Sequence, residues 1–508
     1  MSGLLSIIAV CCVLVFAYAN NRPHDYSDYS IRITSLDKNE RLNTPNLLRR
    51  VVGSKLLRVV GERNFASSEE GVVIRARNER TVEQIKERLL NEGLNEYYKV
   101  EETFKTSPDY QRYINKVNTG DTTYHNYTQL YTFLTEMNNL YPNMTEIFTI
   151  GQSVEQRNLY GIRINTQNRS QVVFSDQVNA PIPKPKVKYI GNIHGDETVG
   201  REILIHFIRD ILMQYQTNGR IQKLLDSIDL YIVPSINPDG FELAQRENKN
   251  DVDMNRNFPD FITGDSEVVQ PEVKAIKNWL SENTFVLSVS FHGGAVVVNY
   301  PLDGLPNGQN YNAYNEEAKT SEDNFFVQLS KSYAKAHSSM SESTEFHQGI
   351  TNGAAWYPLY GGMQDYNYFY ENCPEFTIEL SDTKRPPAAD LLGYYDENKE
   401  ALVVFLENSY KAIGGLVMEH PSLDLVQVPC NITFETNDVT VHSSGSWNYT
   451  LPLKQRDNGF YYKLLLPASY NLTLSCEGMM KKTHNNIAVK ALDDKPIVKN
   501  WVVSRTKM

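Results

Sequence analysis

Short apolar runs alternate with amphipathic segments along most of the chain, from about residue 110 to residue 414. Apolar runs bounded by turn residues predict buried strands, and apolar residues that recur at helical spacing predict helices. Strands are expected over residues 187–193, 230–235, 285–291, 295–300 and 376–380, and helices over residues 197–215, 271–282 and 388–413. This alternation predicts an α/β fold in which a mixed central sheet is flanked by helices.

The pattern is different after Gly415. Short alternating runs at residues 431–434, 439–442, 461–466 and 471–476 are separated by turn residues, which predicts a small all-β sandwich. Two cysteines lie in this part, and the simplest hypothesis is that Cys430 and Cys476 form a disulfide. Cys373, the remaining cysteine outside the N-terminal segment, is expected to be buried and free.

The N-terminus carries an apolar run over residues 4–16, followed by Ala17-Tyr18-Ala19. This pattern predicts a signal peptide, residues 1–19, that is cleaved after Ala19. The alternative is a membrane anchor, but the run is short for a membrane span. We therefore expect a secreted mature protein without a transmembrane anchor. Six Asn-x-Ser/Thr sequons agree with export: Asn126, Asn143, Asn168, Asn431, Asn448 and Asn471.

Residues 20–108 are charged and carry few structural signals apart from a strand expected over residues 72–77 and a helix over residues 82–92. This segment is expected to be an N-terminal extension or a pro-segment, and Arg49-Arg50 is either a processing site or an exposed charged pair. The chain has a formal net charge of -11 and no long basic block. Nucleic acid is therefore not an expected partner.

A histidine and a glutamate lie close together where one predicted strand ends and the next helix begins. His194 and Glu197 belong to the segment Gly191-Asn192-Ile193-His194-Gly195-Asp196-Glu197. His292 follows another predicted strand, so its side chain could reach the same edge of the sheet. Catalytic zinc needs three protein ligands of these types. Taken alone, the two histidines could equally be a helix-capping residue and a satisfied core residue.

A polar loop and a buried acid add to this set. Arg246, Asn255 and Arg256 lie within a short loop before the helix expected at residue 271, and Arg binds a carboxylate through two parallel hydrogen bonds. Glu379 lies in an otherwise apolar strand, where an ionised carboxylate is costly unless it is paired or functional.

The chain carries the spaced segments HGDE, NPDG, DMNRNFPD, HGGAVVVNYPLD, HQGITNGAAWY, GGMQDYNY and NCPEFTIEL. Over roughly residues 110–505 it thereby resembles the zinc metallocarboxypeptidase family, specifically the regulatory subgroup that contains carboxypeptidases D, E, N and M. The fifth segment has one additional residue, Gln348. The resemblance implies a carboxypeptidase-like catalytic domain over residues 109–414 and a transthyretin-like β-sandwich over residues 415–508.

The resemblance also implies a catalytic centre. One Zn²⁺ ion would be bound by His194, Glu197 and His292, with Asp253 orienting the first histidine. Hydrolysis would use zinc-bound water with Glu379 as general base and acid. Arg246 would polarise the scissile carbonyl group.

Four further residues match substrate-binding positions of the subgroup. Asn255 and Arg256 would bind the terminal carboxylate of a peptide or protein substrate, and Tyr357 would close over it. Asp303 and Gln364 would line the pocket for the C-terminal side chain, so a preference for Lys or Arg is expected. The alternative for Asp303 is a loop residue that starts the turn Asp303-Gly304.

These residues together predict a secreted zinc metallocarboxypeptidase that removes single C-terminal residues. Two alternatives are open. One is a catalytically silent, secreted peptide-binding protein on the same fold. The other is a digestive carboxypeptidase for apolar C-termini, against which Asp303 and the predicted β-sandwich argue.

Overall fold

The computed structural model describes residues 30–31, 66–68, 71–75, 123–166, 183–264, 266–306, 316–491 and 495–506. The expected signal peptide, the pair Arg49-Arg50, the helix over residues 82–92 and the sequon at Asn168 lie outside these residues. In the N-terminal part, β1 (Ser30–Ile31), β3 (Gly71–Arg75) and β2 (Ala66–Ser68) pair in that order. The strand expected over residues 72–77 thus corresponds to β3.

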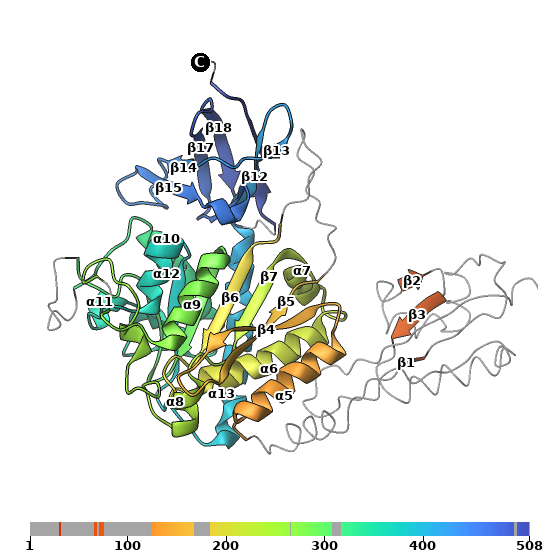
Figure 1. Cartoon of the computed structure of the whole chain (residues 1–508), viewed down its shortest axis with the longest axis vertical. Helices are drawn as coiled ribbons and strands as arrows, with labels where there is room; N and C mark the ends of the chain where they lie inside the picture. Colours follow the sequence, from red (N-terminus) through yellow and green to blue (C-terminus); the bar gives the residue numbers. More distant parts are fainter. Residues whose placement is uncertain are drawn as a thin grey trace, which may run out of the picture. The chain divides into compact units, whose positions relative to one another are not determined.

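An eight-stranded sheet is the centre of the larger part of the structure (Figure 1). Its order is β10-β9-β11-β8-β6-β7-β5-β4. β6, β7, β8 and β11 run parallel, whereas β9 is antiparallel to β11, and β5 is antiparallel to β7 and β4. The strands are β4 (Thr145–Gln152), β5 (Asn158–Ile164), β6 (Lys186–Gly191), β7 (Asp229–Val233), β8 (Phe285–His292), β9 (Ala295–Tyr300), β10 (Ile350–Asn352) and β11 (Glu375–Ser381). The predicted mixed sheet is confirmed.

Helices cover both faces of this sheet. Neighbouring residues of a strand point to opposite faces, so apolar residues of one strand pack against helices on both sides. On β6, Tyr189 packs against Phe207, and its hydroxyl donates to Leu402 O. Ile190 instead joins the core cluster that includes Trp279 and Met363. The helices are α5 (Tyr127–Leu140), α6 (Val199–Gln214), α7 (Gly219–Ser227), α8 (Pro238–Leu243), α9 (Pro271–Glu282), α10 (Asp323–Ala336), α11 (Gly353–Trp356), α12 (Met363–Glu371) and α13 (Leu391–Glu407). The first face is therefore covered by α6 and α13, and the second by α9 and α12.

The remaining strands form the predicted all-β part. One sheet has the order β15-β14-β17-β18, and the other contains β13, β12 and β16, with β19 and β20 also paired to β12. The strands are β12 (Ala412–Glu419), β13 (Asp424–Leu425), β14 (Cys430–Thr436), β15 (Trp447–Leu453), β16 (Phe460–Leu464), β17 (Ala468–Cys476), β18 (Lys482–Val489), β19 (Ile497–Val498) and β20 (Trp501–Val503). This arrangement is consistent with a β-sandwich.

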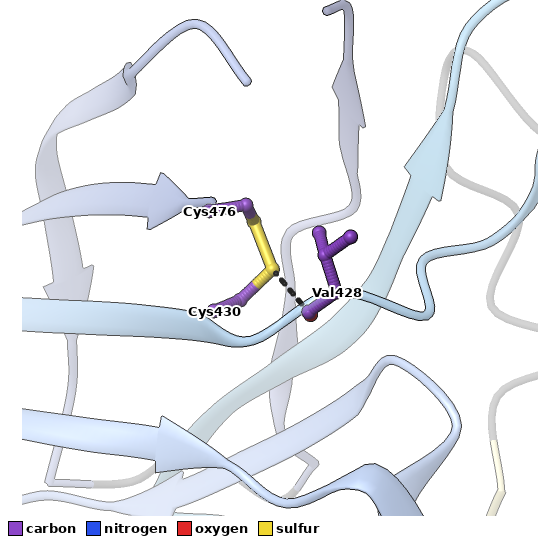
Figure 2. The surroundings of a disulfide bond; sticks show 3 residues. All are labelled: Val428, Cys430 and Cys476. Atoms are coloured by element: carbon purple, nitrogen blue, oxygen red, sulfur yellow. Dashed lines mark hydrogen bonds between the residues drawn. A yellow bond between two sulfur atoms is a disulfide. The ribbon is translucent and has the colours of Figure 1, made fainter. Parts of the chain in front are cut away.

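The expected disulfide is present. Cys430 and Cys476 lie opposite each other on β14 and β17, with an S–S distance of 2.06 Å, and Figure 2 shows Val428 O beside the bridge. Cys373 is free and buried, as predicted. On the exposed face of the same sheet, the sequon residues Asn448 and Asn471 both lie opposite Glu435 of β14, and Asn431 lies farther along that strand.

Three expected elements differ from the structure. The helix over residues 388–413 is shorter, because α13 ends at Glu407 and β12 begins at Ala412. Residues 439–442 form a turn rather than a strand, since the Asp438 carboxylate accepts hydrogen bonds from the backbone and hydroxyl of Thr440. The helix expected from residue 197 begins at Val199, which leaves Glu197 in the preceding loop.

Ion pairs with buried carboxylates join the all-β part to the α/β part. Lys463 of β16 lies 2.5 Å from Glu322, and both side chains are buried. Lys454 and Arg456, in the segment between β15 and β16, lie 2.7 and 2.6 Å from Glu371 at the end of α12. None of the helices in the described part of the chain has the length and apolar character needed to cross a membrane.

Candidate active site

The three proposed metal ligands meet at one edge of the sheet. His194 follows β6, Glu197 precedes α6, and His292 is the last residue of β8. Because β6 and β8 are parallel neighbours, their carboxyl ends lie side by side. His194 Nδ1 and His292 Nδ1 each lie 2.9 Å from Glu197 Oε2.

This donor set fits a zinc ion. One ligand atom from each of the three residues lies within 4.8 Å of the others, and all three residues are buried. The Nε2 atom of His194 is held by Asp253 Oδ1 at 3.2 Å and that of His292 by Ser290 Oγ at 3.1 Å. Both Nδ1 atoms therefore face the Glu197 carboxylate. Two imidazoles whose other nitrogen is held by a hydrogen bond, together with one carboxylate, are a common ligand set for catalytic zinc.

The loop that carries His194 and Glu197 is fixed by Asn192, for which no role was expected from the sequence. Asn192 Nδ2 donates to the carbonyl oxygens of His194, Gly195 and Glu197, and Asn192 Oδ1 accepts from Ser235. A Cβ atom at Gly195 would lie 2.1 Å from the backbone of Gly240. The loop thus packs directly on α8. The sequence signal for this role is an Asn two residues before His194, because Asn tolerates the positive φ of 59° found at Asn192.

The charges around the ligands favour an ionised Glu197. Burial alone would raise the pKa of its carboxyl group, but His194 and His292 hold that pKa well below its usual range. Burial lowers the pKa of His292, which favours the neutral imidazole that a metal needs. Lys384 Nζ lies 3.0 Å from Glu197 Oε1 and 3.5 Å from Asp196 Oδ2. Its position in the loop after the Glu379 strand was the only sequence signal for this contact.

Arg246 and Asp253 lie beside the ligands. Arg246 Nε and Nη2 donate to Asp253 Oδ2 at 3.1 and 2.9 Å, and Arg246 Nη1 lies 3.2 Å from Glu197 Oε1. Although burial opposes ionisation of Asp253, His194 and Arg246 keep the pKa of its carboxyl group below the usual value. An ionised Asp253 therefore bridges His194 and the Arg246 guanidinium group.

Glu379 lies next to His292, because these residues are register partners on the parallel strands β11 and β8. Its carboxyl group is buried, and Oε2 makes no hydrogen bond within the described part of the chain. Burial raises the pKa of Glu379 well above its usual value, the nearby Glu197 raises it further, and Lys384 and Arg246 oppose this shift. A bound dication would add to the effect of these two cations.

The structure brings the expected carboxylate-binding residues to the same region. Asn255 Oδ1 accepts a hydrogen bond from Met363 N at 2.9 Å, so the amide is oriented with Nδ2 as the group left to donate. Arg256 follows Asn255 in a short 3-10 helix and remains partly exposed. Burial raises the pKa of Tyr357, and Glu379 and Arg256 also affect it. The charge of Glu379 adds to this rise, whereas the charge of Arg256 lowers the pKa of Tyr357.

Asp303 and Gln364 are in direct contact. Gln364 Nε2 donates to Asp303 Oδ1 at 2.9 Å, and Asn299 Nδ2 donates to the same oxygen at 3.2 Å. Asp303 is fully buried, and burial raises the pKa of its carboxyl group to about 7. Asp365 accepts hydrogen bonds from the backbone N–H of Asp303. No role was expected for Asp365 from the sequence, although it directly follows Gln364.

The comparisons with known proteins agree with this geometry. Residues 130–401 match the family model described as zinc carboxypeptidase. The chain is 36% identical to carboxypeptidase M of Mus musculus over 70% of this chain and 79% of that protein. It is 34% identical to carboxypeptidase D of Mus musculus over 71% of this chain, but the match spans only 26% of that longer protein.

Among solved structures, thrombin activatable fibrinolysis inhibitor aligns with a TM-score of 0.47 and 19% identity, covering 65% of this chain and 86% of that chain. The family model covers more than half of this chain, and carboxypeptidase M is similar over most of its own length. The chain therefore belongs to the zinc carboxypeptidase family.

Proposed function

We propose that this protein is a secreted, zinc-dependent exopeptidase that removes C-terminal Lys or Arg from peptides and proteins. The observation that carries the proposal is the convergence of His194, Glu197 and His292 at the sheet edge that also holds Glu379. One zinc ion would be bound by the three converging residues. When bound, zinc supplies a water of lowered pKa and a positive charge beside the developing oxyanion.

Glu379 would act as general base and then as general acid. Its buried carboxyl group has an elevated pKa and lies beside His292, so it can accept a proton from the attacking water and deliver it to the leaving amine. Arg246 would donate to the oxygen of the scissile carbonyl group as negative charge develops there. Asp253 supports both neighbours, because it binds His194 Nε2 and the Arg246 guanidinium group.

Exopeptidase action would follow from Asn255 and Arg256. Asn255 Nδ2 and the Arg256 guanidinium group can both donate to the free terminal carboxylate, and Tyr357 would close over it. Asp303 would then face the last side chain of the substrate. A buried carboxylate in that pocket favours a cationic residue, which supports the preference for Lys or Arg.

Three features of the sequence support export: the apolar run at residues 4–16, the following Ala17-Tyr18-Ala19 and the sequons. The domain assignment is part of the proposal. Residues 20–108 would be an N-terminal extension or pro-segment, residues 109–414 the catalytic domain and residues 415–508 a transthyretin-like sandwich.

Zinc-loaded protein should hydrolyse a peptide that ends in a free Arg, and a chelator should abolish the reaction. The C-terminally amidated form of the same peptide is the control, because it lacks the carboxylate that Asn255 and Arg256 would bind. Equal cleavage of the amide would contradict the assignment of these two residues. Absence of cleavage of both forms would support the silent peptide-binding alternative.

A further inference from the structure

The first turn of α12 carries two side chains that contact Asp303. Gln364 donates through Nε2 to Asp303 Oδ1, and its Oε1 accepts from Thr377 N of β11 at 2.7 Å. Both ends of this amide are therefore engaged by the protein. Gln364 therefore links the Asp303 carboxyl group to β11, the strand that carries Glu379.

Asp365 holds the backbone of the same residue. Its Oδ1 and Oδ2 accept from Asp303 N at 3.1 and 3.0 Å, and Oδ2 also accepts from Gly304 N at 3.3 Å. The Asp365 side chain is buried, and within the described part of the chain no Lys, Arg or His side chain forms an ion pair with it. Two consecutive residues of α12 thus fix both the side chain and the backbone of Asp303.

The surroundings of this pair are acidic. Burial raises the pKa of Asp303, and Glu375 and Asp260 raise it further, whereas the hydrogen bond from Asn299 and the charge of Arg256 lower it. Burial raises the pKa of Asp365 well above its usual value, and Asp303 raises it further. The two carboxyl groups therefore oppose each other's ionisation, and a cation that enters the pocket would favour the charged form of both.

We propose that Asp365 is a positioning residue for basic specificity: it fixes the turn that presents Asp303, and its charge helps the pocket to select a cationic side chain. This inference rests on the proposed function, since it concerns the same pocket. The alternative is that Asp365 only stabilises the turn Asp303-Gly304. Its charge would then contribute to stability but leave the choice of substrate unchanged.

Asp365→Asn separates these roles, because it keeps the size and one acceptor oxygen but removes the charge. The matched control is Glu371→Gln, which changes a buried carboxylate at the other end of the same helix. For both variants and the wild type, kcat and KM would be measured on two peptides that differ only in a C-terminal Arg or Leu. Zinc content would be measured in parallel.

We expect Asp365→Asn to lower the Arg-to-Leu ratio of kcat/KM by about tenfold or more, as for loss of a charge-assisted interaction, mainly through a higher KM for the Arg peptide. Glu371→Gln should keep the wild-type ratio. An unchanged ratio in Asp365→Asn would overturn the inference while the wild-type activity kept the proposed function intact. If the zinc-loaded wild type hydrolysed neither peptide, the proposed function and this inference would both be rejected.

A second measurement covers the case in which Asp365→Asn does not fold. Calorimetry of the wild type near pH 7, in buffers of different ionisation enthalpy, gives the protons released when a product peptide ending in Arg binds. We expect the Arg product to release at least one proton more than the Leu product, because the cation charges both carboxyl groups, whereas Asp303 alone is already partly ionised at pH 7 and can release less than one proton. A difference of less than one proton would overturn the inference.

Discussion

Single residues at the sheet edge have separate tasks although they lie within a few ångströms of one another. Asp253 connects His194 to Arg246, and Asn192 holds the loop of the ligands through three carbonyl oxygens. Glu379 has a buried oxygen beside this network that forms no hydrogen bond with any residue that the structure describes. The hydrogen bonds and the protonation of each group therefore depend on its neighbours.

Arg246→Ala should reduce kcat by about 10²–10³-fold, as expected for loss of an oxyanion donor. The measurement is steady-state hydrolysis of a peptide that ends in Arg by the zinc-loaded variant. Because Arg246 also contacts Glu197 and Asp253, zinc content must be determined on the same preparation. Near-normal turnover at full zinc content would remove Arg246 from the mechanism.

The preference for basic C-termini should depend on pH. Burial raises the pKa of Asp303 to about 7, so the charged form becomes dominant only as the pH rises through that value. The Arg-to-Leu ratio of kcat/KM should therefore increase from pH 6 to pH 8, about one unit on either side of that pKa. Effects of pH that are common to both substrates cancel in the ratio.

Asp303→Asn is the control for this pH profile, since its ratio should be low and should not vary with pH. The other charged groups that shift the pKa of Asp303 remain unchanged in this variant: Arg256, Asp260 and Glu375. A pH-dependent ratio that survived in Asp303→Asn would assign the titration to another group.

At the scale of elements, the site depends on how loops pack between strands and helices. Gly195 lies against the backbone of α8, where a Cβ atom would be 2.1 Å from Gly240. The loop between β6 and α6 therefore has little room to move. Its position determines where His194 and Glu197 point.

Gly195→Ala should displace this loop, lower the zinc affinity and reduce stability by about 1–3 kcal/mol, as overpacking does. Zinc titration and thermal unfolding of the variant would test this expectation. Gly219→Ala is a matched control, because a Cβ atom there would meet none of the described residues within 4 Å. If Gly195→Ala bound zinc as tightly as this control, the loop would not be constrained in the way described.

Much of this element order could be predicted from the sequence, because apolar runs and helical periodicity are local signals. Pro271, for example, marks the start of α9. Local signals could not show where α13 ends, since β12 is held as a strand by pairing with distant β16, β19 and β20. The closeness of His194 and Glu197 in the chain is itself a local signal, so this part of the site could be predicted.

Other parts of the site depend on long-range pairing. The register between His292 and Glu379 comes from two strands far apart in the chain, and the contact of Lys384 with Glu197 depends on the same pairing. Asp365 binds the backbone of Asp303, which lies 62 residues earlier in the sequence. No local pattern predicts such contacts.

At the scale of the whole molecule, the larger part of the structure, residues 122–508, is one compact unit. The ion pairs of Glu322 and Glu371 lie between its α/β and all-β parts. A buried carboxylate that loses its cation is strongly destabilising. The two parts should therefore unfold together.

Lys463→Met should lower the free energy of unfolding by about 3–5 kcal/mol, because Glu322 would remain buried without its partner. Replacing both residues, Lys463→Met with Glu322→Gln, should restore much of this loss. Urea unfolding followed by tryptophan fluorescence provides the measurement. Arg220→Met removes partly exposed pairs with Glu400 and Glu407 and should cost less than about 1 kcal/mol for each pair. An equal effect of the two single variants would contradict the argument.

The outer face of the β15-β14-β17 sheet carries three exposed asparagines. Asn431, Asn448 and Asn471 are all exposed on these three adjacent strands, and each begins a sequon. In an exported chain, oligosaccharides attached there would stand close together and screen that side from other macromolecules. A protein that approached the all-β part would then have to come from its edges.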